Sequence, residues 1–133
     1  MSATKTAITT TVPLVGTGVV AAAVASGATA IVAAASQAAG ISLEVGGAAI
    51  PASGFAVLTA VFSLVGVLLA AILSRMARRP RIIFVRTTVV LTLLSLVPDV
   101  LADAAPATKA ILMLTHLVAA AIVIPAVARR LSA

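Results

Sequence analysis

Three polar residues in the C-terminal half of the chain have the types and spacing for acid–base or cation chemistry. Asp99 and Asp103 lie four residues apart at the end of one apolar run, and His116 lies inside the next run. That spacing places both carboxylates on one helix face. The two runs are joined by a short loop, so their helices must be antiparallel neighbours. At about 1.5 Å per residue, Asp99 and His116 then lie at similar depths, and a contact between them is expected.

Two interpretations of this pair stay open. A histidine paired with a carboxylate inside a membrane can titrate near neutral pH, relay protons or bind a cation. The same pair can be a structural hydrogen bond between two helices, worth about 0.6–2 kcal/mol, and we favour this second interpretation. Glu44 belongs to the same candidate polar cluster only if its loop folds back over the bundle; otherwise it is a solvated residue.

The residue types do not favour a metal, a cofactor or catalysis. One histidine and three acids show no tight metal-ligand spacing, and the chain has no cysteine. His116 and Met113 are three residues apart on one helix, so they do not suit opposite axial positions of a haem iron. The chain shows no nucleophile–base–orienter triad and no glycine-rich phosphate loop. We therefore expect no catalytic residue, no metal and no cofactor.

Four apolar runs must position these side chains. The 133-residue chain is 62% hydrophobic and 9% charged, whereas a soluble domain carries about 25% charged residues. Each run can supply the roughly 20 residues of a membrane-spanning helix, and the first is too long for a cleaved signal peptide. We predict an all-α membrane fold, a four-transmembrane-helix bundle forming a single domain, with spans at about 13–35, 55–73, 82–101 and 110–128, an outer loop at 36–54 and a cytoplasmic basic loop at 74–81.

The charged residues indicate the orientation of the bundle. Eight of the nine basic residues fall at the chain ends and around the second break, while the other breaks hold Lys109 and the three acids. The positive-inside rule then places both termini in the cytoplasm, as in a multi-pass protein of the cell inner (plasma) membrane. The basic residues set this topology or contact anionic lipid headgroups: Lys5, Arg75, Arg78, Arg79, Arg81, Arg86, Arg129 and Arg130.

The outer loop contains an alternating segment, Ile41 to Val45, followed by Gly46-Gly47. Alternation followed by a glycine pair is typical of a β-hairpin. A lone hairpin is marginal in water, so it would have to pack on the outer end of the bundle. A short extracellular β-hairpin over about 41–51 and an irregular loop are the two alternatives.

Small residues recur at every fourth position in the first two spans. They form one face in the first span and a shorter one in the second: Gly18, Ala22, Ser26, Ala30 and Ala34, and Gly66, Ala70 and Ser74. Such faces let helix backbones approach closely in lipid.

Three segments resemble a known family. They are Arg79-Pro80-Arg81 with Phe84-Val85-Arg86, Leu94-Ser95-Leu96-Val97-Pro98-Asp99, and Leu114-Thr115-His116-Leu117-Val118-Ala119-Ala120. In these segments the chain is similar to a family of small four-helix actinobacterial integral membrane proteins, catalogued as a domain of unknown function. The resemblance implies four spans in an actinobacterial inner membrane and brings no substrate or reaction.

Three functions fit the sequence. We favour a non-enzymatic scaffold, accessory or self-associating membrane component, whose partners are the lipid bilayer with its anionic headgroups and a second copy or a larger membrane protein. The alternatives are a small transporter or channel that uses the outward-facing Asp/His cluster, and a membrane enzyme on a lipid-like substrate. Nucleic acid is not expected as a partner, because the basic residues flank apolar spans.

Overall fold

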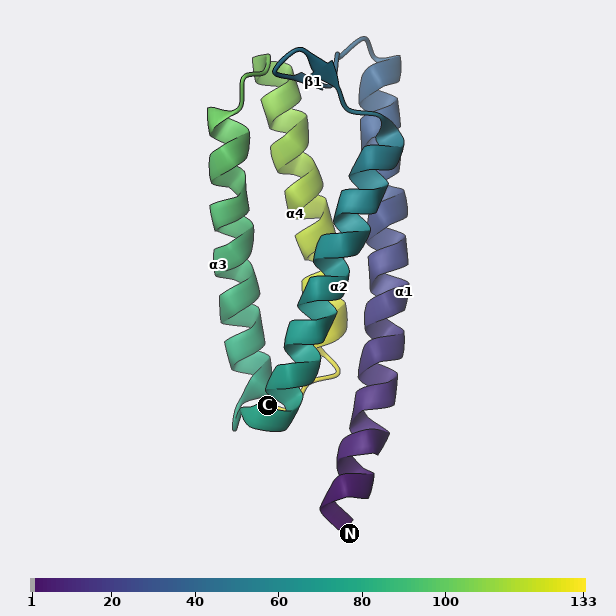
Figure 1. Cartoon of the computed structure of the whole chain (residues 1–133), viewed down its shortest axis with the longest axis vertical. Helices are drawn as coiled ribbons and strands as arrows, with labels where there is room; N and C mark the ends of the chain where they lie inside the picture. Colours follow the sequence, from purple (N-terminus) through teal and green to yellow (C-terminus); the bar gives the residue numbers. More distant parts are fainter. Residues whose placement is uncertain (1) are drawn as a thin grey trace.

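The computed structural model describes the backbone of residues 2–133 and the side chains from Thr11 onward, so the side chain of Lys5 lies outside the described residues. Four helices form the bundle: α1 (Ser2–Ala38), α2 (Ala52–Met76), α3 (Pro80–Leu101) and α4 (Pro106–Ala128) (Figure 1). All four are long and apolar enough to cross a membrane. Two short strands, β1 (Glu44–Val45) and β2 (Ala48–Ala49), lie between α1 and α2. The predicted four-helix membrane bundle is confirmed, and so is the hairpin.

Prolines mark where α2, α3 and α4 begin. Pro80 and Pro106 occupy the first turns of α3 and α4, and Pro51 caps α2. The first helical position tolerates proline because its N–H would have no partner there. As a result, α4 starts earlier than the expected span, and Lys109 lies in its first turn rather than in the loop. The Lys109 Nζ donates to the carbonyl of Val100 near the end of α3, at 2.9 Å.

The most extensive helix contact in the bundle joins α1 to α2. Gly18 lies against Val67, and the Thr29 and Thr59 hydroxyl oxygens are 2.9 Å apart across the same contact. From Thr11 onward, the buried positions of α1 are Leu14, Gly18, Ala21, Ala22, Ala25, Thr29, Ala33 and Ser36. These positions combine steps of three and four residues, because a strict four-residue step drifts by about 40° per turn. The expected small-residue face therefore holds at Gly18 and Ala22 and reaches the surface by Ala34.

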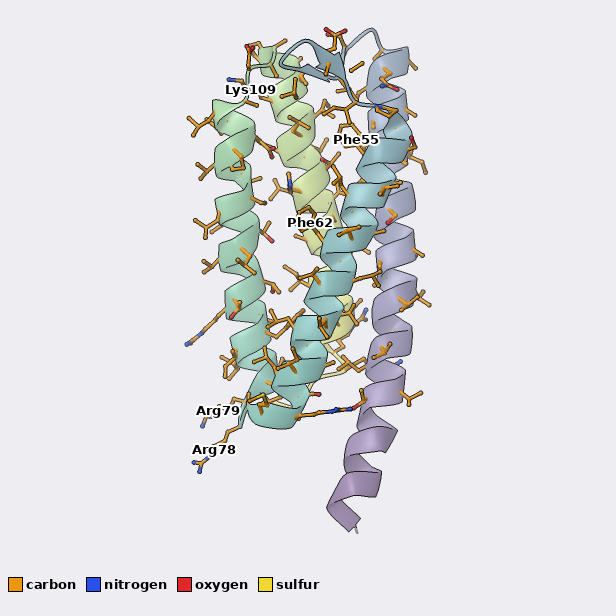
Figure 2. All side chains as sticks on the ribbon, in the orientation of Figure 1. Phe55, Phe62, Arg78, Arg79 and Lys109 are labelled. Carbon is orange, nitrogen blue, oxygen red and sulfur yellow. The ribbon has the colours of Figure 1, made fainter. Side chains whose placement is uncertain are left out.

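The half of the bundle that carries the chain ends, which is the inner half in the orientation predicted from the charges, holds the main apolar core. It is filled from all four helices and the C-terminal tail by Leu14, Val67, Ala70, Phe84, Val123, Val127 and Leu131, with further alanines of α1 and α4. Both the N-terminal end of α1 and the C-terminus lie at this end of the molecule (Figure 1). The basic side chains Arg78 and Arg79 project from this end, and Lys109 lies at the opposite one (Figure 2).

The hairpin caps the opposite end, which is the outer end in the same predicted orientation (Figure 1). Glu44 pairs with Ala49 and Val45 with Ala48, and the turn between them is Gly46-Gly47. Both glycines have positive φ, 58° and 79°, which a residue with a Cβ adopts at a cost. This conformation is the reason that the glycine pair predicted a two-residue turn.

Two hydrogen bonds attach the hairpin segment to the loop and helix that follow α3. The backbone N–H of Gly46 donates to the Asp103 carbonyl at 2.8 Å, and the Thr108 hydroxyl donates to the Ser42 carbonyl at 2.5 Å. Leu43 is buried between them in a second small core with Phe55. We call this attachment the outer clasp. It gives the short hairpin the packing partner that its size requires.

Candidate functional site

A groove runs along the side of the bundle between α2, α3 and α4. It has a volume of about 350 Å³, and its walls include Phe55, Phe62 and Gly66 of α2, Phe84 and Leu91 of α3, and His116 and Ile124 of α4. Leu58, Phe62 and Leu91 are each more than half exposed, so its mouth opens on the surface that meets lipid in a membrane. We call this cavity the lateral groove.

The lateral groove exists because α3 lies beside α2 at the inner end and is held to α4 near the outer end (Figure 1). Pro80 and Phe84 are buried at the inner end, and Asp99 is buried near the outer end. In Figure 1, α2 crosses from beside α1 at the outer end to beside α3 at the inner end, so the α2–α3 separation widens outward. The side chains between the two anchored ends of α3 therefore line the groove or face lipid.

Asp99 and His116 meet near the outer end of α3, and we call this contact the outer anchor. His116 Nδ1 lies 2.8 Å from Asp99 Oδ2, with side-chain exposures of 39% and 11%. The same nitrogen lies 3.0 Å from the backbone carbonyl of Leu112. Of these two acceptors only the Leu112 carbonyl is aligned with the N–H, and Asp99 Oδ2 is buried without an aligned donor. The pair is thus an electrostatic contact at hydrogen-bond distance, with its hydrogen directed toward the backbone.

This arrangement defines the tautomer of the neutral imidazole. Nδ1 faces two acceptors, the Leu112 carbonyl and the Asp99 carboxyl group, so it carries the ring hydrogen. If Nδ1 carried no hydrogen, its lone pair would face a lone pair of the Leu112 carbonyl oxygen, and the two would repel each other. The neutral ring therefore leaves Nε2 without a hydrogen, and the described residues offer Nε2 no partner.

The other polar residues singled out from the sequence do not join this pair. Glu44 on β1 and Asp103 after α3 are exposed. Among the described residues, no group of three His, Asp or Glu side chains could hold a metal ion. The hairpin covers the outer end, as the clustering hypothesis required, but its Asp103 contact is made by the backbone of Gly46.

Three hydroxyl side chains on α3 form hydrogen bonds within their own helix. The hydroxyls of Thr88, Thr92 and Ser95 all line the groove, and each donates to a backbone carbonyl one turn earlier on α3. On α4, Thr115 donates to the Leu112 carbonyl in the same way. These side chains present little unsatisfied hydrogen-bonding capacity to the cavity.

The basic residues differ in whether their side chains bond to the rest of the protein. Arg75, Arg78, Arg79, Arg86 and Arg130 are exposed and have no hydrogen bond or ion pair from their side chains to the described residues, whereas Arg129 donates back to its own helix at Pro125. Arg81 differs, because its Nε lies 3.0 Å from the carbonyls of both Ala128 and Leu131. It closes the C-terminal end of α4, a role that its place in the basic run did not indicate.

Two features of the site escaped the sequence reasoning. The lateral groove depends on the relative tilt of α2 and α3, which no residue pattern reports. Ser63, on the groove wall of α2, is 7% exposed and makes no hydrogen bond with any described residue. A lone serine in an apolar span is the only signal that the sequence offered for it.

Replacing His116 with leucine is expected to destabilise the protein more than replacing Asp99 with asparagine. The first change leaves a buried carboxyl group alone and should lower the free energy of unfolding by about 1–3 kcal/mol. The second keeps an acceptor beside Nδ1 and should cost less than about 1 kcal/mol. Unfolding of purified variants in mixed micelles, followed by circular dichroism, measures both. The double variant His116→Leu/Asp99→Leu should recover most of the loss, and an additive double loss would contradict this account.

Comparison with known proteins adds a family and no activity. A family model described as "Family of unknown function (DUF6069)" matches the chain over residues 9–133. No curated protein matches the chain, and no solved structure matches it. The functional argument therefore rests on the geometry described above.

Proposed function

Because the chain belongs to this family of unknown function, DUF6069, which supplies no reaction, we propose from its geometry that it is a non-enzymatic accessory or scaffold component of the plasma membrane. In this proposal both termini and the basic loop face the cytoplasm, and the hairpin faces outward. The gathering of Arg78 and Arg79 at the end that holds the termini supports this orientation (Figure 2).

The observation that carries the proposal is the closed inner half of the bundle. Phe84, Leu14 and Val127 have no exposed surface and fill the space between the helices there. Inside the bundle, the ionisable side chains among the described residues are Asp99 and His116, both at the outer anchor. An ion that reached His116 would meet an apolar core before it reached the basic end. Burying a charge in such a core is costly.

A transporter is the second candidate, favoured by the contact between Asp99 and His116. A relay needs a continuous series of groups that can pass a proton. The groove hydroxyls that lie inward of His116 donate to their own helix, as Thr88 does to the Phe84 carbonyl at 2.7 Å. The polar path is therefore shorter than the membrane, which favours an accessory role over transport.

Proton flux separates the two candidates. Wild-type protein in liposomes with an internal pH dye and an imposed membrane potential should acidify the lumen no faster than protein-free liposomes, because the inner core excludes ions. Asp99→Asn, reconstituted to the same density, serves as the matched control and should give the same rate. Flux in the wild type that is lost in a folded Asp99→Asn would replace the accessory role with transport.

A further inference from the structure

Two polar groups in the lateral groove have no partner within the described protein. Ser63 is more than nine-tenths buried and lines the cavity, yet its hydroxyl makes no hydrogen bond with a described residue. His116 lines the same cavity, and its Nε2 is likewise unpartnered while Nδ1 is occupied. The remaining groove hydroxyls donate to their own helices or, at Thr59, pair with Thr29. The groove opens on lipid, which offers no hydrogen-bond partner, so in a membrane an occupant of the groove must supply the partner of these two groups.

Ser63 and His116 lie at similar positions along α2 and α4, and both line the groove. Ser63 is eleven residues after the start of α2, and His116 is ten residues after the start of α4, both counted from the outer end. At about 1.5 Å per residue, these positions are roughly 16 and 15 Å along their own helices. The contact of His116 with Asp99, two residues before the end of α3, places His116 in the outer half of the bundle. The groove thus holds a polar spot in the outer half of the bundle, with apolar walls on either side.

The charge of the groove limits the chemistry of an occupant. No charged side chain lines the cavity among the described residues, and the carboxyl group of Asp99 lies directly behind His116. An anionic head, such as a phosphate or a carboxylate, would meet no cation there and would lie close to an acid at membrane depth. A neutral imidazole with a bare Nε2 needs a hydrogen-bond donor. An uncharged hydroxyl group meets both conditions.

We propose that the lateral groove binds an uncharged lipid with a hydroxyl head and an apolar chain, of the kind represented by prenols and quinols. The hydroxyl donates its hydrogen to His116 Nε2 and accepts one from Ser63 Oγ. The chain lies against the apolar walls formed by Phe62, Leu91 and Ile124. The cavity volume of about 350 Å³ is within the range of known ligand pockets. This inference goes beyond the accessory role and is tested separately from it. If the groove binds no such lipid, the expected result of the proton-flux experiment stays the same.

The lone histidine makes the proposal directly measurable. His116 is the only histidine of the chain, so protein labelled with ¹⁵N-histidine in phospholipid nanodiscs gives one pair of ring signals. Nε2 of the free, neutral ring should show the shift of a nitrogen without hydrogen. Geranylgeraniol, a prenol, should move that signal saturably, because its hydroxyl donates to Nε2. Its methyl ether has the same chain and no donor, and should leave the signal in place.

Two further probes identify the source of the hydroxyl. A short-chain menaquinol kept reduced tests the quinol class, and geranylgeranyl phosphate tests an anionic head. Saturable binding of either alcohol with no response to the phosphate supports the proposal, and the tighter of the two alcohols names the class. Binding of the phosphate alone, equal responses to alcohol and ether, or a free neutral ring with hydrogen on Nε2 would each overturn it.

Paired variants exclude a merely structural effect. Ser63→Ala removes a hydroxyl that holds no internal hydrogen bond, so folding should be unchanged while the Kd for the alcohol rises about tenfold. Ser95→Ala is the matched control, because Ser95 also lines the groove but donates to the Thr92 carbonyl at 2.6 Å. Its Kd should stay within about twofold of the wild type, since no contact with the ligand is lost. An unchanged Kd in Ser63→Ala would overturn the assignment of the head group.

A second pair of variants tests the cavity itself. A side chain at Gly66 would enter the groove, where nothing lies within 4 Å of its Cβ position, so Gly66→Leu should abolish saturable binding. Gly27→Leu makes the same change at an equally open site on α1, which contributes no residue to the groove, and should bind normally. Normal binding by a folded Gly66→Leu would place the ligand elsewhere and reject the proposal.

Discussion

Replacing Gly18 with alanine should lower the free energy of unfolding by about 1–3 kcal/mol, the usual cost of adding a methyl group to a filled contact. A Cβ at this position would overlap both methyl groups of Val67. Val67 is 5% exposed and lies on α2, where a valine has one strongly preferred χ1 rotamer, so its side chain cannot turn away. The helices must move apart, and leucine should therefore destabilise the protein more than alanine.

The chain provides its own control for this effect. A Cβ at Gly16 meets nothing within 4 Å, so Gly16→Ala makes the same chemical change without the overlap and should be neutral or slightly stabilising. Adding Val67→Ala to Gly18→Ala should return part of the loss, a coupling that a double-mutant cycle measures in mixed micelles. Equal effects at the two glycines would show that the α1–α2 contact is looser than described.

Replacing Arg81 with glutamine should loosen the C-terminal end of the protein and cost about 2 kcal/mol, as for other hydrogen bonds to charged groups. Its Nε donates to the carbonyl of the last α4 residue, Ala128, and to that of Leu131 just beyond the helix, and its own N–H donates to the Ser132 carbonyl at 3.2 Å. A cation at a helix C-terminus also offsets the helix dipole. Without it, Leu131, which is 2% exposed, loses the support that holds it in the inner core.

Hydrogen exchange over residues 123–133 together with thermal unfolding measures this effect. Arg79→Gln is the control for the effect of charge on membrane topology. It removes one positive charge two residues before Arg81, and the Arg79 side chain makes no hydrogen bond to the described residues. Arg81→Lys keeps the charge but cannot reproduce the guanidinium donor, and it should behave more like glutamine than like arginine. Full protection in Arg81→Lys would mean that charge alone matters.

The architecture was predictable from sequence because it follows from solvent and charge. An apolar run of membrane length has to be a helix, since lipid offers no partner to its backbone groups. The glycine pair at Gly46 predicted a turn that needs positive φ, and the observed hairpin has it. The approach of Asp99 to His116 follows from a short loop and a shared depth, with no knowledge of side-chain packing.

The lateral groove and the role of Arg81 could not be predicted from the sequence, and the cause is physical. A hydropathy pattern reports whether each residue prefers water or an apolar environment. In lipid, an apolar side chain has a similar free energy against another helix and against an acyl chain. The tilt of α2 against α3 is therefore absent from the pattern. Likewise, Arg81 is one of several arginines that lie close together in the sequence. Only the fold shows that its side chain, unlike theirs, bonds to the end of α4.

The outer clasp also has a consequence for how the protein is made. Its partners, the segment at Ser42 and Gly46 and the segment at Asp103 and Thr108, are separated along the chain by two complete spans. In the proposed orientation, the first loop crosses the membrane during synthesis before the second. The clasp can therefore form only after the third span has been inserted, so it marks the arrival of the last outer loop. A nascent chain that stops after α2 leaves the Gly46 N–H and the Ser42 carbonyl without these partners.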